Sequence, residues 1–342
     1  MNIIITILML GIIIMIHELG HFLTAKYFKM PVEEFSLGMG PVLFSYEGLY
    51  TRYCLRAIPM GGFVNIEGME VDSVVKNGFN TKNPFQRFVV LIAGVVMNFI
   101  LAYVIVFGSL LYNGKAVQNE NPVIGNIIET SKSFGDLKKG DEILEIDNNK
   151  IVKWEDISRV NDVIDSDKME FLIKRGDKVI KKEIQLTFDE QRNDYYIGIL
   201  PEYSIEKYTF IDAVYESGTA YKNLFIMILN GFKQLVTGQV SAKEISGPVG
   251  IVKIVGEASQ DGIGILFWLT ALLSINIGFF NLLPFPALDG GRIIFVLLEV
   301  VGIKINKRFE ERFHMVGMVI LFGLIILITF NDVLNIFDTL KK

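Results

Sequence analysis

Two histidines four residues apart lie inside an apolar stretch, and a glutamate directly follows the first of them. The motif His17-Glu18-Leu19-Gly20-His21 comes after a run of isoleucine, leucine and methionine that begins at Ile3. Side chains four apart share one face of a helix, so both imidazoles can reach a single metal ion. Glu18 projects from the adjoining position, where it can take a proton from a metal-bound water. The pattern predicts a zinc hydrolase.

The surroundings of the motif indicate a membrane. Ionisable groups cost about 3 kcal/mol or more in hydrocarbon, so they are seldom found there without a function. The chain is 51% hydrophobic and 21% charged, which is too apolar for an ordinary soluble protein of 342 residues. A net charge of −5 argues against a nucleic-acid partner. Cys54 is the single cysteine, which excludes an internal disulfide.

Four apolar segments are long enough to span a bilayer. They lie at about 2–27, 88–112, 263–283 and 313–330, and the last is the shortest, close to the lower limit of about 17 residues. No lysine or arginine precedes Lys26, so we expect the first segment to be retained as a span and not removed as a signal peptide. The expected fold is a polytopic α-helical membrane protein with four transmembrane helices.

Lysine and arginine in the short loops predict the orientation. Both the loop after the first span and the loop after the third are rich in these residues, which places the two loops in the cytoplasm. Both termini and the long segment 113–262 are then extracytoplasmic. His17 and His21, near the end of the first span, lie toward the cytoplasmic side.

The region 117–200 has the composition of a small α/β domain. Alternating apolar runs predict strands at 123–128, 142–147, 169–174 and 180–186, with a helix at 156–165 between them. Turn signals fall at 140–141 and 147–149. We expect a compact half-open barrel whose free edge could accept a peptide strand.

The domain at 117–200 divides the membrane part of the chain into two halves, 1–112 and 263–342. The segment 201–262 links the inserted domain to the second half. A six-residue apolar run at 224–229, flanked by charged and amide side chains, predicts an amphipathic helix within this linker.

A second chemical cluster occupies residues 281–292. Pro284 and Pro286 break the third span, and an acidic residue, Asp289, precedes two glycines. Irregular backbone at membrane depth is tolerated only where it is buried in protein or lines a wet cavity. Two histidines make an incomplete zinc site, for which a carboxylate is an accepted third ligand, and Asp289 is the best-placed candidate.

Each of these residues also has an ordinary structural interpretation. His17 and His21 could be satisfied core histidines, and Asp289 could be a helix N-cap. His314 is better explained as an interfacial residue at the start of the fourth span than as a ligand. For Asn98, a hydrogen bond between helices and a functional role are equally compatible with the sequence.

The chain resembles the site-2 protease family of intramembrane zinc metalloproteases, in the bacterial RseP-like branch that carries a PDZ domain. The resemblance covers nearly the whole length and is most specific in the first and last of its motifs. These motifs are His17 to His21, Phe35 to Pro41, Arg56 to Val64, Ala93-Gly94 with Asn98, Lys139 to Leu144, Ser246 to Gly250, and Asn281 to Arg292.

The resemblance implies roles for individual residues. His17, His21 and Asp289 would bind Zn²⁺ and Glu18 would activate water, while Asn281 and Pro284 match positions implicated in substrate handling. The loop at 32–66 resembles a membrane-reentrant β-hairpin, with substrate contacts at Gly61 and Gly62, although an ordinary cytoplasmic hairpin is the alternative. Such a strand edge would replace hydrogen bonds that a transmembrane substrate loses when its helix unwinds.

The resemblance also implies a function. The expected activity is zinc-dependent cleavage of single-span membrane proteins, such as anti-sigma factors, or of remnant signal peptides, in a bacterial inner membrane. The single PDZ-like domain would bind peptides or exclude substrates with large outer domains, but Ser131 to Gly135 departs from the small-residue helix usual there. The rival interpretations are a non-proteolytic PDZ scaffold, a transporter or channel, and a membrane protease for soluble substrates.

Overall fold

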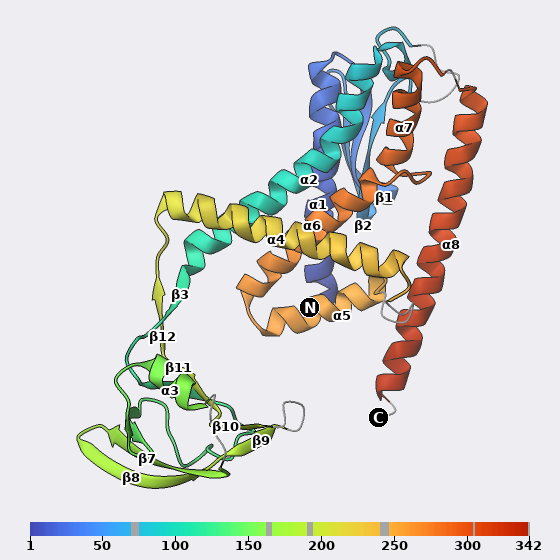
Figure 1. Cartoon of the computed structure of the whole chain (residues 1–342). Helices are drawn as coiled ribbons and strands as arrows, with labels where there is room; N and C mark the ends of the chain where they lie inside the picture. Colours follow the sequence, from blue (N-terminus) through green and yellow to red (C-terminus); the bar gives the residue numbers. More distant parts are fainter. Residues whose placement is uncertain (70–74, 162–165, 190–193, 240–245, 304, 341–342) are drawn as a thin grey trace. The chain divides into compact units, whose positions relative to one another are not determined.

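The computed structural model describes residues 1–69, 75–161, 166–189, 194–239, 246–303 and 305–340 (Figure 1). The chain forms two compact units. One unit combines Met1–Leu111 with Phe210–Lys342, and the other is Tyr112–Thr209. The first unit therefore contains both chemical clusters, and the second is an insertion between them.

Four helices of the described chain are long and apolar enough to cross a membrane, as predicted. They are α1 (Asn2–Tyr27), α2 (Pro84–Asn113), α6 (Ile263–Leu282) and α8 (Lys307–Leu340). The prediction that the fourth span is the shortest was wrong, because its candidate span covers 27 residues whereas α6 has only 20. Charged residues at both ends of α8 shorten its apolar run without ending its helix.

The apolar run at 224–229 belongs to a much longer helix, α4 (Phe210–Val236). Its buried residues Ala213, Ser217, Leu224 and Ile228 recur on one face, and Lys222 and Lys233 are exposed. The buried face packs in a cluster with Ala102 of α2 and Ile275 of α6. The predicted amphipathic helix is therefore present, but its length was underestimated because exposed polar residues interrupt the apolar run. The shorter α5 (Pro248–Gln260) follows.

A long antiparallel hairpin lies against α1. Strand β1 (Val32–Glu47) pairs with β2 (Arg52–Ile66). Ser36 has a pairing partner on each side, Cys54 and Phe63, so this part of β1 lies between two parts of β2. Buried residues of the hairpin share one cluster with α1, α2 and α7 (Asp289–Val300), namely Ala25, Val32, Ile66, Val90 and Ile293. The hairpin is thus a fixed part of the helical unit.

Helix α8 is attached to the rest of its unit through polar contacts. Asp332 is 5% exposed although it lies in an apolar helix. Its carboxylate accepts hydrogen bonds from the backbone N–H groups of Gly247 at 3.1 Å and Gly250 at 2.8 Å. These groups lie at the beginning of α5, where unpaired N–H groups favour a negative charge.

The inserted unit is a small α/β domain. A four-stranded sheet has the order β6-β5-β7-β8, and three further strand pairs join β3 to β12, β4 to β11 and β9 to β10. The elements are β3 (Lys115–Gln118), β4 (Ile124–Ile127), β5 (Glu142–Ile146), β6 (Asn149–Lys150), α3 (Trp154–Asn161), β7 (Lys168–Arg175), β8 (Lys178–Gln185), β9 (Thr187–Asp189), β10 (Asp194–Tyr196), β11 (Ile199–Pro201) and β12 (Tyr203–Glu206).

The four strands expected from the sequence of this unit correspond to β4, β5, β7 and β8. The expected helix begins two residues earlier, at Trp154, and its last four positions, 162–165, lie outside the described residues. A turn is anchored by Asp141, which is 1% exposed and accepts two hydrogen bonds of 2.7 Å from Arg175. This bidentate pair compensates the burial of the carboxylate.

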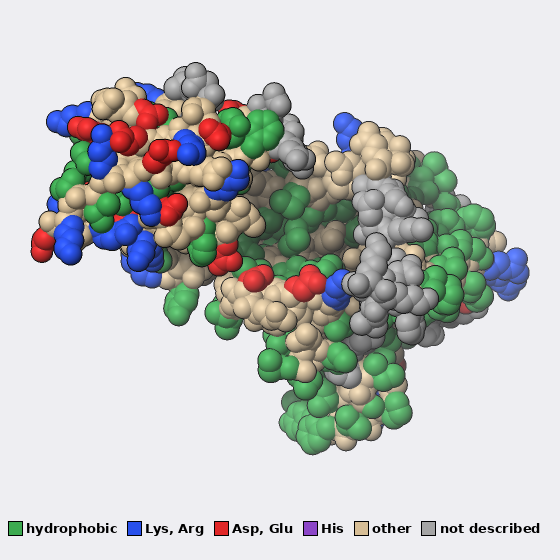
Figure 2. All heavy atoms as spheres, turned by 90° about the horizontal axis from the view of Figure 1, so that it is seen from below, with side chains coloured by type: hydrophobic (Ala, Val, Ile, Leu, Met, Phe, Trp, Pro, Cys, Tyr) green, Lys and Arg blue, Asp and Glu red, His purple; other side chains and the backbone are tan. Residues whose placement is uncertain are grey.

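The two units differ in surface chemistry. Exposed hydrophobic side chains are numerous on α1, α2, α6 and α8, whereas lysine and glutamate form many of the surface ion pairs of the inserted unit. Figure 2 shows charged side chains gathered on one part of the molecule and hydrophobic ones on another. This difference matches one unit that is surrounded by lipid and one that lies in water.

We expect the inserted unit to fold by itself, because it has its own core around Phe171, Ile143 and Ile173, all 0% exposed. In a fragment of residues 112–209, Phe171→Ala should lower the free energy of unfolding by about 3–5 kcal/mol, since it leaves a cavity. Val179→Ala, at a position 60% exposed on the neighbouring strand, is the control and should change it little. Urea unfolding followed by circular dichroism measures both, and equal effects would contradict this assignment of the core.

Candidate active site

Three potential metal ligands from distant parts of the chain meet at one point. His17 and His21 lie on α1, and Asp289 is the first residue of α7. Asp289 Oδ2 lies 3.0 Å from His17 Nε2 and 3.4 Å from His21 Nε2, and the two Nε2 atoms are 3.1 Å apart. Both histidines are buried, at 7% and 8% exposure.

The geometry of this triangle fits Zn²⁺. A tetrahedral zinc site with bonds of about 2.0–2.1 Å places neighbouring ligand atoms about 3.3 Å apart. The three measured separations lie close to that value. Two imidazole nitrogens and one carboxylate oxygen are also a typical donor set for a catalytic zinc, which keeps its fourth position open.

A tight loop delivers Asp289 to this point. Helix α6 ends at Leu282, before Pro284, and the next helix begins at Asp289. Inside the loop Ala287 has φ +74°, and carbonyl oxygens of Leu283 and Phe285 press against the Cα atoms of Gly290 and Gly291, where a Cβ would lie 2.3–2.4 Å away. The two glycines therefore permit the fold-back, and the carboxylate faces the histidines instead of capping the helix.

His314 supports this loop, a role that the sequence did not predict. Its Nδ1 accepts a hydrogen bond of 3.0 Å from the backbone N–H of Ala287, two residues before Asp289. Beside it, Gly317 of α8 packs closely against Pro286. The interpretation of His314 as an interfacial residue was therefore incomplete. A signal was available in the sequence, since this is the third of only three histidines and it also lies in an apolar segment.

Helix α2 packs directly behind the two imidazoles. His21 Nδ1 is 2.7 Å from the carbonyl oxygen of Val90, so the ring donates its Nδ1 proton there and keeps Nε2 free for a metal. A Cβ on Gly94 would lie 2.5 Å from His21 Nε2 and 2.8 Å from His17 Nε2. Only glycine leaves room for both rings at this position.

A cavity of about 380 Å³ opens over the three ligands. Glu18 and Asn281 line it together with His17, His21 and Asp289, so five predicted site residues surround one space. Val64 of β2 lines the same cavity, and its backbone N–H interacts with the Glu18 carboxylate.

The glycines and the proline of the predicted site are placed differently. A Cβ on Gly62 would lie 3.5 Å from Glu18 Cγ, so Gly62 lies beside Glu18. Gly61, with φ +98°, packs instead on Met39. Pro284 lies in the loop after α6 and is not among the described residues that line the cavity. The structure thus places Gly62 next to Glu18, and none of the three is among the described residues that line the cavity.

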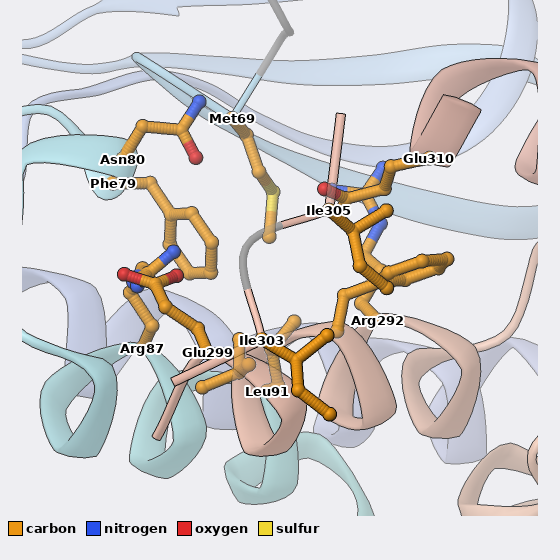
Figure 3. Close-up of a pocket in the computed structure, with 12 residues that line it drawn as sticks. Met69, Phe79, Asn80, Arg87, Leu91, Arg292, Glu299, Ile303, Ile305 and Glu310 are labelled. Carbon is orange, nitrogen blue, oxygen red and sulfur yellow. The ribbon is translucent and has the colours of Figure 1, made fainter. Parts of the chain in front are cut away.

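A second cavity, of about 220 Å³, is shown in Figure 3. Arg87 of α2 and Glu299 of α7 form an ion pair of 2.5 Å at its wall. Met69 and Arg292 line both cavities. Polar side chains therefore continue from the candidate active site into a neighbouring space.

Comparison with known proteins agrees with this geometry. The model of Peptidase family M50 matches residues 5–324. A protein of Fusobacterium nucleatum subsp. nucleatum named "Putative zinc metalloprotease" is 47% identical over 99% of this chain and 100% of its own length. A Clostridium perfringens protein with the same descriptive name is 37% identical over 98% and 99%. The regulator of sigma-W protease RasP of Bacillus subtilis is 28% identical over 97% and 98%.

Among solved structures, the PDZ domain of an SdrC-like protein from Listeria monocytogenes covers 25% of this chain and 90% of its own, at 26% identity and a TM-score of 0.22. The assignment of residues 117–200 as PDZ-like stays a prediction. The family match, in contrast, covers both halves of the membrane unit, and the ligand triangle joins residues from the same two halves. The chain belongs to Peptidase family M50, and it is the zinc-dependent metalloendopeptidase that its sequence predicted.

Proposed function

We propose that this protein cleaves peptide bonds within the membrane, at a zinc site made by His17, His21 and Asp289. The observation that carries the proposal is the triangle of ligand atoms, 3.0–3.4 Å apart, with Glu18 in the same cavity. These ligands belong to α1 and to the segment after α6, and both helices are apolar enough to span a bilayer. A site at this depth suits a substrate bond that lies in the bilayer.

The reaction divides between the ion and the side chains. Zinc, when bound, lowers the pKa of water and polarises the scissile carbonyl group. Glu18 accepts the proton of the attacking water and later delivers it to the leaving amine. The backbone N–H of Val64, which lines the same cavity, interacts with this carboxylate. Asn281 lines the same cavity and can donate its amide hydrogens to the developing oxyanion.

The hairpin supplies a place for an unwound substrate. A transmembrane helix keeps its amides in internal hydrogen bonds, so the segment to be cleaved must open first. Strand β2 runs past the site from Gly62 to Val64, adjacent to Glu18. An added substrate strand would recover its backbone hydrogen bonds there. Gly62 keeps this approach free of a side chain.

Glu18→Gln should abolish cleavage, by at least about 100-fold, while the protein keeps its zinc, because the amide cannot accept the proton and Glu18 is not a ligand. Cleavage of a single-span substrate in proteoliposomes, together with metal analysis, measures both quantities. Glu47→Gln, at a side chain 72% exposed on the hairpin, is the matched control. If Glu18→Gln cleaved at the wild-type rate, Glu18 could not be the base; if wild-type protein were also inactive, a scaffold role would gain support.

Asp289→Ala should lose both zinc and cleavage, because two histidines alone hold the ion weakly. Metal content of the detergent-purified variant measures the first effect directly. His17→Ala is expected to behave in the same way, and Glu47→Gln should retain one zinc per chain. A full equivalent of zinc in Asp289→Ala would remove Asp289 from the ligand set.

We also propose that the substrates are single-span membrane proteins already trimmed outside the membrane, such as anti-sigma factors, or remnant signal peptides. The enzyme would reside in a bacterial inner membrane with both termini and the inserted unit outside and the site toward the cytoplasm. The positive charge of the two short loops supports this orientation. The name of the related RasP, a regulator of sigma-W protease, supports the substrate class.

The inserted unit is proposed to be a PDZ-like domain that restricts which substrates reach the site. It has a groove of about 560 Å³ between α3 and the segment around Tyr195 and Ile199. Ile128, Trp154 and Ile157 contribute apolar surface to it. A helix facing an extended segment is an arrangement that can accept a peptide strand.

Removal of the inserted unit tests this role. Gln118 and Tyr203 are direct partners in the antiparallel pair of β3 and β12, so residues 119–202 can be replaced by Asn-Gly. The shortened enzyme should cleave substrates with intact outer domains, which the full chain cleaves slowly, and should cleave trimmed substrates as before. Glu18→Gln in the shortened chain should abolish both activities. Unchanged restriction in the shortened enzyme would contradict the proposed selection.

A further inference from the structure

Three residues spaced four apart on α2 face the two histidines of α1. Val90 accepts the Nδ1 proton of His21 through its carbonyl oxygen, and Gly94 leaves room for both rings. Asn98 is next in this series, and its amide Nδ2 lies 3.4 Å from His17 Nδ1. Residues four apart share a helix face, so this stripe of α2 is matched to the histidine spacing on α1.

The side chain of Asn98 is buried without a suitable partner. Asn98 is 0% exposed, and its Oδ1 has no hydrogen-bond partner among the described residues. A buried carbonyl oxygen left unpaired is costly. At the same time Nδ2, a donor, faces the ring nitrogen of His17 that must carry the proton when Nε2 binds a metal. Turning the amide by 180° pairs Oδ1 with that proton.

We propose that Asn98 is a positioning residue for the zinc site, whose amide oxygen accepts the Nδ1 proton of His17. This inference rests on the proposed zinc site. The bond fixes the ring so that Nε2 keeps its lone pair directed at the ion, as Val90 does for His21. Hydrogen bonds to the second nitrogen of a metal-binding histidine orient the ring and raise its basicity.

A purely structural role for Asn98, as a link between helices, is already filled by its backbone. Ser274 of α6 donates its hydroxyl to the carbonyl oxygen of Asn98 at 2.8 Å. Gly278, one turn further along α6, brings this helix close to Asn98 and Phe99. The contact between α2 and α6 therefore does not require the amide side chain, which is directed at His17 instead.

The test compares two substitutions at Asn98 in the full-length protein in detergent. Asn98→Leu keeps the branched shape of the side chain but has no acceptor, and should weaken zinc binding by about 10–100-fold in competition with a chelator. Asn98→Asp keeps an acceptor oxygen and should bind zinc within a few-fold of wild type. Ser274→Ala removes a buried hydrogen bond to the same residue without affecting the imidazole, and should leave zinc affinity unchanged.

A spectroscopic measurement gives a readout that altered packing does not mimic. The chain has three histidines, so ¹⁵N labelling of histidine gives only three imidazole patterns. In the zinc-loaded wild type, two rings should carry their proton at Nδ1. Asn98→Leu should shift the Nδ1 signal of one of these and leave the other, bound to the Val90 carbonyl, in place.

The outcomes separate this inference from the proposed function. A wild-type chain that binds no zinc through His17, His21 and Asp289 would remove the zinc site itself. Zinc binding by wild type, with equal affinity in Asn98→Leu, would retain the site and overturn the role of Asn98. Equal loss in Asn98→Leu and Asn98→Asp, with both folded, would also overturn it, because the acceptor would then be irrelevant.

Discussion

The structure depends on the cost of placing ionisable groups among apolar helices. His17, His21 and Asp289 are tolerable at this depth only because their polar atoms meet one another. One carboxylate and two imidazoles replace for one another the hydration that each group would otherwise lose. The pairing joins α1 near the beginning of the chain to α7, 272 residues later. The inserted unit must therefore leave the two halves free to assemble.

Each element around His17, His21 and Asp289 positions one part of the candidate site. The glycines at the start of α7 allow the chain to fold back so that Asp289 reaches α1. His314 secures that loop from α8, and Gly94 lets α2 approach the rings. The hairpin contributes a backbone N–H to Glu18 and a strand beside it. The candidate site is thus assembled from packing constraints on several helices, while the proposed chemistry is concentrated in four side chains.

Part of the candidate site could be predicted from the sequence, and part could not. The spacing of His17 and His21 predicted that both imidazoles share one helix face, as they do, because the helix period is local information. Asp289 followed from a broken span and from family resemblance. The supporting residues were harder to predict, since Asn98, His314 and Asp332 act on partners far away in the sequence. The length of α4 was misjudged for a related reason, because its exposed lysines carry no information about the face that packs on α2 and α6.

Helix α8 differs from the other spans in how it is retained. Only 6% of its most apolar window is buried within the protein. In a bilayer, apolar surface gains little by exchanging lipid for protein, so such a helix is not held by the hydrophobic effect. Its position depends on the Ala287 bond to His314 at one end and on Asp332 with the α5 amides at the other. The attachment of this helix is therefore governed by two sets of hydrogen bonds, and loss of either set would free one end of α8 without any change in its lipid-facing side chains.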